Sequence, residues 1–182
     1  MTHRLPKTSF CLIRHGETTA NRDGVIAGRL EVSLTETGRA QAQALSLLTW
    51  PDAYVLFTSP MERAKETCRF GFPSEKFQTH PGLRERDWGM FEGRPLAELP
   101  PRDGRPDQGE DWGEMINRVA EAIHDSYQSS HGRLPIFVCH SGVIRAARIL
   151  AGFHSVGTRP ANARPIYFNW TGDGHQETTH DV

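Results

Sequence analysis

Two histidines and two arginines follow short apolar runs of the chain, and one glutamate lies in a loop after another run. Arg14 and His15 end the first run, Arg63 lies one helical turn beyond the second, and His140 ends a later one. Arginine forks bind phosphate oxygens in a bidentate way, and a neutral imidazole can attack phosphorus. A carboxylic acid such as Glu85 can protonate a leaving oxygen. This set of side chains is therefore suited to phosphoryl transfer.

The apolar patterns predict alternating strands and helices that would position these residues. Strands are expected over 9–13, 54–58, 76–80, 136–139 and 166–170, and helices over 35–50, 60–70, 111–130 and 143–151. Several strands are short continuous apolar runs, which is typical of a parallel sheet covered by helices. We predict a three-layer α/β/α fold with a mostly parallel central sheet, as a single domain over residues 1–182. The carboxyl ends of its strands are where ligands bind.

Local signals place the ends of these elements. Ser33 and Glu36 have the spacing of a capping box, and Ser59 followed by Pro60 predicts a helix N-terminus. The segment 81–109 is rich in proline and glycine, and we expect it to be irregular, with one short helix near Leu96. Irregular segments of that length are usually functional. The polar tail from Thr171 is expected to be loose.

The 182 residues carry 21 Lys+Arg against 22 Asp+Glu, a formal charge of −1. This balance argues against binding to nucleic acid or to a membrane surface by bulk charge. Three widely spaced cysteines, Cys11, Cys68 and Cys139, form neither a zinc motif nor a disulfide framework. The first residues are too polar for a signal peptide, and no apolar stretch reaches the length of a membrane span. We therefore predict a cytoplasmic protein.

Several segments share a known pattern in the same order along the chain. The most specific are Leu-Ile-Arg-His-Gly-Glu-Thr at 12–18, Ser-Pro-Met-Glu-Arg-Ala at 59–64 and His-Ser-Gly at 140–142. Segments 34–42, 83–93 and 109–119 add weaker matches. Together they resemble the histidine phosphatase superfamily, also called phosphoglycerate mutase-like. One departure from the family pattern is Ser141, where many relatives have glycine, and we expect it to have little effect. The other is the short chain, because the mutases of the family carry longer insertions.

The resemblance implies a role for each matching residue. His15 would be the nucleophile, and Glu85 would protonate the leaving alcohol and then assist the attack of water. The phosphoryl group would be held by Arg14, Arg63, His140, Asn21 and the backbone N–H of Ser141 or Gly142. The backbone of Ala27 and Gly28 would approach the substrate. Members of this family need no metal and no other cofactor, because arginine and histidine supply the positive charge.

We favour a phosphatase that hydrolyses a small phosphorylated metabolite and releases inorganic phosphate, because the chain is short and an open site admits water. A mutase that transfers phosphate between hydroxyls, and a silent phosphate- or phosphoprotein-binding module, are the alternatives. Glu85 also has a simpler interpretation, as part of a solvated charge cluster with its neighbours.

Arginine supplies 18 of the 21 basic residues. Beyond Arg14 and Arg63, the candidates to flank the pocket are Arg22, Arg29, Arg84, Arg86 and Arg94. We attribute the other eleven to composition bias. Trp88 and Phe91 are candidates for an apolar wall.

Overall fold

The computed structural model describes residues 5–179 and contains a six-stranded sheet. Its strands are β1 Phe10–Arg14, β2 Tyr54–Thr58, β3 Phe77–Thr79, β4 Leu134–Cys139, β5 Pro165–Trp170 and β6 His175–Thr179, in the spatial order β3-β2-β4-β1-β5-β6. Neighbours among β3, β2, β4 and β1 are parallel, and β5 and β6 are antiparallel additions at one side. The predicted mostly parallel sheet is confirmed.

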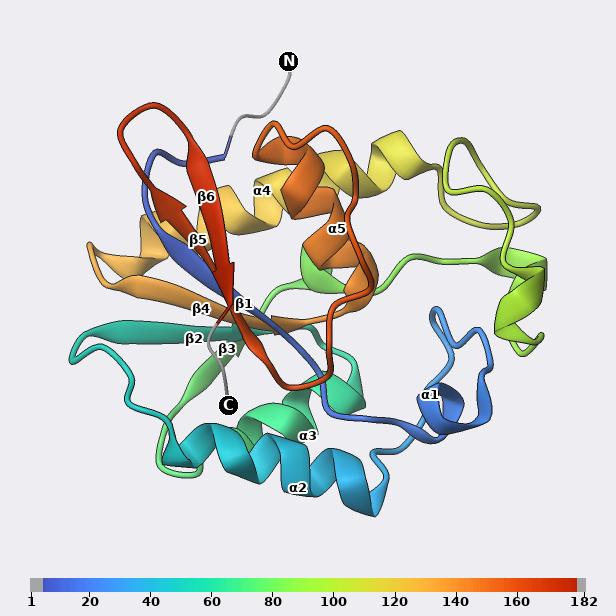
Figure 1. The fold of residues 1–182 in the computed structure, drawn as a ribbon, viewed down its shortest axis with the longest axis horizontal. Helices are drawn as coiled ribbons and strands as arrows, with labels where there is room; N and C mark the ends of the chain where they lie inside the picture. The colour runs from blue at the N-terminus through green and yellow to red at the C-terminus, as the bar shows by residue number, and fades with distance from the viewer. Residues whose placement is uncertain (1–4, 180–182) are drawn as a thin grey trace.

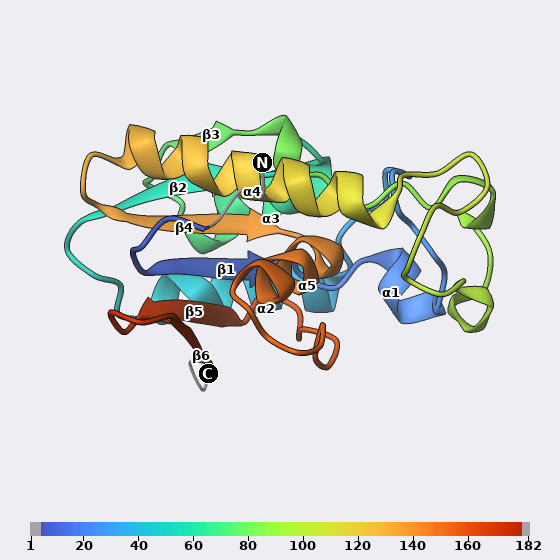
Figure 2. The same ribbon diagram turned by 90° about the horizontal axis from the view of Figure 1, so that it is seen from above.

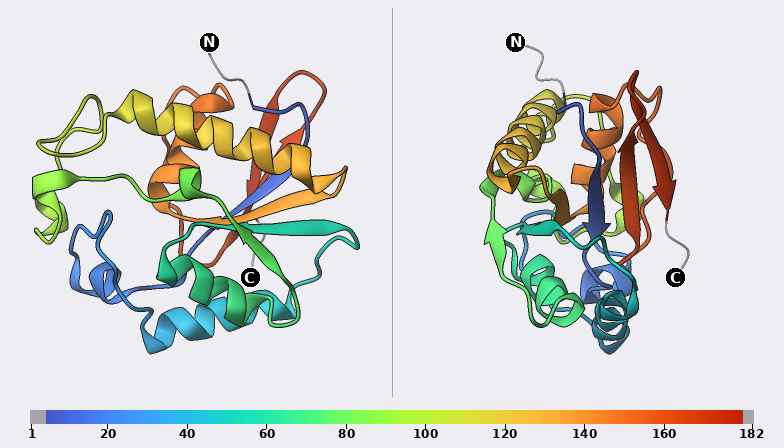
Figure 3. Two further views of the ribbon diagram at one scale, coloured as in Figure 1. Left: turned by 180° about the vertical axis from the view of Figure 1, so that it is seen from behind. Right: turned by 90° about the vertical axis from the view of Figure 1, so that its left-hand side faces the viewer.

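Helices cover both faces of this sheet. The helices of the structure are α1 Thr19–Asp23, α2 Glu36–Ala44, α3 Glu62–Gly71, α4 Trp112–Ser130 and α5 Ser141–Leu150, with 3₁₀ turns η1 Leu45–Leu47, η2 Pro81–Leu83, η3 Gly89–Phe91 and η4 Leu96–Glu98. Helices α4 and α5 pack on one face, and α2 and α3 pack on the other (Figures 1 and 3). This is the predicted three-layer arrangement.

Strand β1 shows why its sequence is apolar throughout. Phe10 and Leu12 belong to the core beneath α4 and α5, whereas Cys11 and Ile13 belong to the core beneath α2 and α3. Successive side chains of a strand point to opposite faces, so a strand covered on both sides has no position for a polar residue until it ends. The first polar residue is Arg14, which lies at the carboxyl end.

Two predicted helix starts are wrong. Helix α2 is capped by Thr35, whose hydroxyl accepts from the N–H of Gly38 at 3.0 Å, and Ser33 does not cap it. Helix α3 begins at Glu62 with Met61 as its cap, so Ser59 lies outside it. The predicted helix 35–50 is also too long, because its last part is the turn η1. Spacing alone did not distinguish these neighbouring cap candidates.

The tail from Thr171 is not loose as predicted. Residues His175–Thr179 form β6, which pairs antiparallel with β5 through a tight turn in which Thr171 N donates to Gly174 O at 2.9 Å. This edge strand is mostly polar, and its side chains are half-buried or exposed. Because this strand is held mainly by backbone hydrogen bonds, its sequence shows little of the apolar pattern that predicts a strand.

The segment 81–109 is tied to the loop after α1. The N–H of Ile26 donates to Arg94 O at 2.9 Å, the N–H of Gly93 donates to Ile26 O at 2.8 Å, and Val25 forms a bridge with Pro95. Both segments lie at the carboxyl ends of the central strands (Figures 1 and 2). The predicted short helix near Leu96 is confirmed as η4. Across residues 5–179, no helix has the length and apolar character to cross a membrane.

Arg148 of α5 attaches β6 to the rest of the molecule. Its guanidinium forms a bidentate pair with Glu177 at 2.8 and 2.7 Å and donates to the carbonyls of Val156 and Thr158. We expect Arg148→Met to lower the free energy of unfolding by about 3 kcal/mol, because it leaves these acceptors unpaired. Urea unfolding measures this. Arg69→Met removes an exposed ion pair and should lower the free energy of unfolding by less than about 1 kcal/mol. Equal losses of stability in the two variants would contradict this role of Arg148.

Candidate active site

The two histidines meet because their strands are parallel neighbours. In the β1–β4 register Arg14 lies opposite Cys139, so the residues that follow, His15 and His140, leave the sheet side by side. Their ring centroids are 5.2 Å apart and their planes are tilted by 60°. Both rings are buried, with exposed fractions of 4% and 0%. The fold thus joins two histidines that are 125 positions apart in the sequence.

The hydrogen bond of the His15 ring determines its tautomer. Nδ1 lies 2.8 Å from the carbonyl oxygen of Gly16. A carbonyl oxygen accepts only, so Nδ1 carries the hydrogen and Nε2 of the neutral ring carries the lone pair. The backbone beside the ring is also held, because Asn162 Nδ2 donates to His15 O at 2.8 Å. The ring of His15 is therefore held in one orientation, with the lone pair of its neutral form on Nε2.

The surroundings of His15 keep it neutral. Burial, and then the positive charges of Arg63 and Arg14, lower the pKa of His15 well below its usual 6.5. Burial and Arg63 lower the pKa of His140 in the same way. Because the lone pair on Nε2 exists only in the neutral ring, these charges keep His15 reactive into mildly acidic solution.

The lowered pKa of His15 predicts a pH dependence of stability. Between its folded-state pKa and about 6.5, the unfolded chain binds a proton at this residue and the folded chain does not. The free energy of unfolding therefore falls as the pH is lowered through this range. We expect His15→Asn, which cannot titrate, to remove about 1–2 kcal/mol of the decrease between pH 6.5 and 5. Urea unfolding at a series of pH values measures this. The same decrease of the free energy of unfolding with pH in the variant and in the native protein would contradict the prediction.

Arg14 and Arg63 are both buried, at 5% and 2% exposure. Arg14 donates through Nη1 to Pro160 O at 2.8 Å, and its Nε has no partner among the described residues. Arg63 donates to the carbonyls of Leu30 and Gly28 at 2.8 and 2.7 Å. These bonds fix both guanidinium planes. Two fixed cations beside a neutral imidazole form a site for an anion.

Gly28 and Asn21 come from the loop and turn that follow β1. Gly28 has a left-handed φ of 51°, and a Cβ there would collide with the carboxylate of Glu92, so glycine is required where its carbonyl holds Arg63. The amide oxygen of Asn21 accepts from Thr18 N at 3.1 Å and from Asn162 at 3.2 Å. This leaves the amide N–H₂ of Asn21 for a ligand.

Glu85 lies across the site from His15. Its carboxylate accepts from the N–H of Arg86 at 2.8 Å and from the N–H of Gly142 at 3.2 Å. A Cβ at Gly142 would collide with this carboxylate, so the glycine permits the close approach. The Gly142 N–H, predicted to bind phosphate, is thus bonded to Glu85 in this structure. The carboxylate is held in place, and the interpretation of Glu85 as a solvated charge cluster is not supported.

The backbone around Glu85 is held by Arg118 of α4. Its guanidinium donates to the carbonyls of Gly82, Arg84 and Glu85 at 2.7, 2.8 and 3.2 Å, and it pairs with Glu110 at 2.8 Å. Three carbonyl oxygens of the stretch 82–85 are thereby anchored to one helix. Arg118 therefore positions the acid.

His140 is linked to the start of α3. Its Nε2 lies 2.8 Å from the hydroxyl of Ser59, and this hydroxyl accepts from Met61 N at 3.2 Å. The Nδ1 atom is buried and has no partner among the described residues. His140 lies behind His15 and does not itself line the cavity described below. Its role as a phosphoryl donor stays a prediction.

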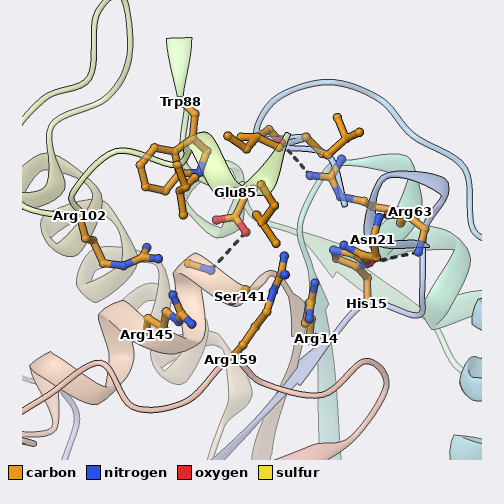
Figure 4. Close-up of a pocket in the computed structure, with 18 residues that line it drawn as sticks. Arg14, His15, Asn21, Arg63, Glu85, Trp88, Arg102, Ser141, Arg145 and Arg159 are labelled. Atoms are coloured by element: carbon orange, nitrogen blue, oxygen red, sulfur yellow. Dashed lines mark hydrogen bonds between the residues drawn. The ribbon is translucent and has the colours of Figure 1, made fainter. Parts of the chain in front are cut away.

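One cavity collects most of the predicted residues (Figure 4). It is lined by the predicted Arg14, His15, Asn21, Ala27, Gly28, Arg63, Glu85, Ser141 and Gly142, and by Thr18, Val25, Ile26, Trp88, Leu96, Leu99, Arg102, Arg145 and Arg159. Glu85 is the one carboxylate in this lining, against five arginines. Across residues 5–179, no group of three or more His, Cys, Asp or Glu is placed to hold a metal ion.

A sequence profile of the histidine phosphatase superfamily (branch 1) matches residues 10–162. The chain belongs to this superfamily. The matched range includes all of the candidate site residues and the four parallel strands that position them. The resemblance seen in the motifs is therefore confirmed.

Individual members of the superfamily are also similar to this chain. The metal-independent phosphoserine phosphatase of Arabidopsis thaliana is 30% identical over 159 residues, covering 76% of this chain and 66% of the relative. The adenosylcobalamin/α-ribazole phosphatase of Escherichia coli is 31% identical over 149 residues, covering 73% of each. The solved phosphoglycerate mutase of Thermus thermophilus has a TM-score of 0.75 at 26% identity, covering 96% of this chain and 100% of that one.

The five arginines expected to flank the pocket are directed elsewhere. Arg22 pairs with Asp23 at 2.8 Å, Arg29 with Asp87 at 2.9 Å and Arg94 with Glu98 at 3.7 Å, all with exposed side chains on the arginine. Arg84 lines a separate depression, together with Arg29. The carboxylates that pair with Arg22 and Arg94 are close in sequence, whereas Asp87, the partner of Arg29, comes from the segment 81–109.

Arg86 is also not a pocket residue. It is fully buried and donates to the backbone carbonyls of Arg102, Gly104 and Glu110, with its guanidinium 4.4 Å from the Trp88 ring. Of the two aromatic candidates, Trp88 lines the cavity, and Phe91 lies under Arg94 outside it.

Three arginines that we had attributed to composition bias line the cavity instead. Arg102, Arg145 and Arg159 come from the loop before α4, from α5 and from the loop after α5. For Arg145 the sequence did contain an indication that it lines the cavity, because it lies one helical turn after Ser141, at the start of the same helix. The other two lie in irregular loops, where no periodicity indicates the direction of a side chain.

Proposed function

We propose that this protein is a metal-independent phosphomonoesterase that forms a phosphohistidine on His15 and releases inorganic phosphate from a small phosphorylated metabolite. The observation that carries the proposal is the hydrogen bond from His15 Nδ1 to Gly16 O, beside two buried arginines. It fixes a neutral imidazole with its lone pair on Nε2 in a cationic cavity. A histidine that only bound phosphate would be a better donor if it were protonated.

In the first step His15 Nε2 attacks phosphorus, and the bond from phosphorus to the ester oxygen breaks. The proton on Glu85 passes to the departing alkoxide, which leaves as an alcohol. Arg14 and Arg63 neutralise the charge on the phosphoryl oxygens without moving, because their other donors are already bonded to the backbone. The product of this step is phosphohistidine and a Glu85 carboxylate.

In the second step water attacks the phosphohistidine. The Glu85 carboxylate accepts a proton from the water, the P–N bond breaks, and the electron pair returns to His15 Nε2. Inorganic phosphate leaves, and Glu85 is again protonated. Glu85 lines both this cavity and the adjoining depression, so water has access to it from both sides.

The names of relatives support hydrolysis over a binding role. Two of those described above are named phosphatases, and one of these is named metal-independent. The three described cysteines are free and buried, which accords with a reducing compartment such as the cytoplasm. A phosphomutase shares the same phosphohistidine step and differs only in whether water or a second hydroxyl accepts the phosphate.

Trapping of the intermediate tests the mechanism. After brief reaction with ³²P-labelled phosphomonoester and alkaline quenching, peptide mapping is expected to place an acid-labile phosphate on His15. EDTA is expected to leave turnover unchanged. Phosphate on Ser59, or loss of turnover in EDTA, would overturn the mechanism. A product assay separates the mutase, which would yield an isomerised phosphoester and little free phosphate.

A further inference from the structure

Three guanidinium groups of the cavity are not used by the proposed reaction. Among the described residues, the side chains of Arg102, Arg145 and Arg159 have no hydrogen-bond or ion-pair partner, and Arg145 Nε is buried without one. Arg102 and Arg145 are half-buried, and Arg159 is exposed. Outside the cavity, in contrast, Arg29 and Arg94 pair with carboxylates and Arg86 donates to carbonyls. We call Arg102, Arg145 and Arg159 the distal arginines.

The distal arginines lie away from the nucleophile. In Figure 4, Arg102 and Arg145 are on the opposite side of the cavity from His15 and Arg63, and Arg159 extends between them beside Arg14. A phosphoryl group held at His15 therefore leaves Arg102 and Arg145 for another part of the same ligand.

The charges of the cavity are not balanced by a phosphoryl group alone. A bound phosphomonoester carries a charge of about −2, and Glu85 is the one acid of the lining. Because the proposed first step begins with a proton on Glu85, about three of the five guanidinium charges are left without a counter-ion. Burial, and then the positive charges of Arg102 and Arg159, lower the pKa of Arg145 to about 10. A second anion would offset these charges.

Apolar side chains form part of the cavity wall, and one of them, Trp88, lies beside Arg102. Trp88 is buried, with 6% of its surface exposed, and Leu96 and Leu99 line the cavity beside it. The guanidinium of Arg102 lies 5.5 Å from the Trp88 ring and 5.3 Å from the Trp112 ring. Stacking on aromatic rings fixes the plane of an arginine while leaving its N–H edge free for a ligand. The guanidinium of Arg102 is therefore preorganised.

We propose that the distal arginines form a second anion subsite, and that the substrate is a small phosphomonoester with a carboxylate or a second phosphate at its far end. This inference rests on the proposed phosphatase function for the identity of the first anion. The guanidinium forks bind both carboxylate and phosphate, and the apolar wall accommodates a short carbon chain between the two groups.

Matched substrate pairs test the subsite. 3-Phosphoglycerate and glycerol 3-phosphate differ in one carboxylate, and fructose 1,6-bisphosphate and fructose 6-phosphate differ in one phosphate. We expect kcat/KM of the native protein, measured by phosphate release, to favour the member with the second anion by ~10–100-fold in at least one pair. The pair that responds identifies the second group.

Variants assign the selectivity to residues. Arg102→Gln and Arg145→Gln are each expected to lower the ratio of kcat/KM within the responding pair by ~10-fold. The control is Arg94→Gln, an exposed arginine outside the cavity, which should leave the ratio unchanged. Equal kcat/KM within both pairs, or a ratio that neither cavity variant alters, would overturn the subsite.

A binding measurement separates this proposal from the proposed function. Calorimetry with the His15→Ala variant compares the affinity of 3-phosphoglycerate and fructose 1,6-bisphosphate with that of their single-anion partners, with and without Arg145→Gln. If the native protein released no phosphate but binding still favoured the second anion through Arg145, the phosphatase function would fail and the subsite would stand. If phosphate release depended on His15 but binding showed no such preference, the subsite alone would fail.

Discussion

Replacement of His15 by alanine is expected to reduce phosphate release by ~10⁴-fold or more and to abolish labelling by phosphate. The variant removes the atom that bonds to phosphorus, and no other described nucleophile lies at this point of the cavity. His140 is behind the ring, and its Nε2 faces Ser59. Losses of this size follow when the nucleophile of a covalent mechanism is removed. Steady-state phosphate release and intact-protein mass spectrometry measure the two effects.

The matched control is His124→Ala. His124 is an exposed residue of α4 whose ring contacts Gln128, and its loss should leave activity within about twofold. Circular dichroism and urea unfolding of His15→Ala establish that the sheet is intact. Turnover within a hundredfold of the native protein in a folded His15→Ala variant would mean that another residue, or water, attacks phosphorus.

Replacement of Glu85 by glutamine is expected to lower kcat by ~10²–10⁴-fold for an alkyl phosphate, because its alkoxide needs a proton to leave. For 4-nitrophenyl phosphate the first step needs no such proton. We therefore expect a burst of nitrophenolate, followed by slow turnover, because the water of the second step still lacks its base. Stopped-flow absorbance measures the burst, and the phosphohistidine should accumulate in the quenched protein.

Glu66→Gln is the control for this carboxylate. Glu66 of α3 pairs with Arg39 of α2 and does not line the cavity, so its neutralisation should change neither rate nor burst. A Glu85→Gln variant that lost activity equally on both leaving groups, without a burst, would assign Glu85 to binding or to the loop structure. The leaving-group comparison is needed because this carboxylate also accepts two backbone hydrogen bonds.

Residues at strand ends were the predictable part of the site. Arg14, His15 and His140 directly follow apolar runs, and the carboxyl ends of neighbouring parallel strands necessarily meet at one edge of the sheet. Arg63 is fixed by the first turn of a helix with a clear apolar face. For such residues the direction of the chain is set by regular structure, so the sequence predicts both the neighbours and the side of the sheet.

Residues on loops were not predictable in this way. Arg29 and Arg86 are close to predicted motifs, yet one pairs with Asp87 and the other is buried against backbone carbonyls. Arg102 and Arg159 lie outside every motif and line the cavity. Whether a loop arginine points inward depends on carboxylates and carbonyls contributed by other segments, and these are brought near it only by the fold.

The same distinction applies to the elements themselves. Strand β1 and helix α4 bury enough apolar surface to have clear patterns, whereas α1 rests on a five-residue turn capped by Thr18 and Asn21, and β6 rests on backbone pairing and the Arg148–Glu177 pair. Short polar elements are stabilised by partners that are distant in sequence, so no local window of sequence contains the reason for their existence.

By itself the sequence determined the α/β class, the family and the residues that would hold and attack a phosphoryl group, because these depend on local periodicity and on motifs at strand ends. Only the tertiary structure decided the tautomer of His15, the attachment of Glu85 to Gly142, and which arginines face the ligand. Each of these depends on a contact between segments far apart in the chain, where distance and direction, not residue type, determine the chemistry.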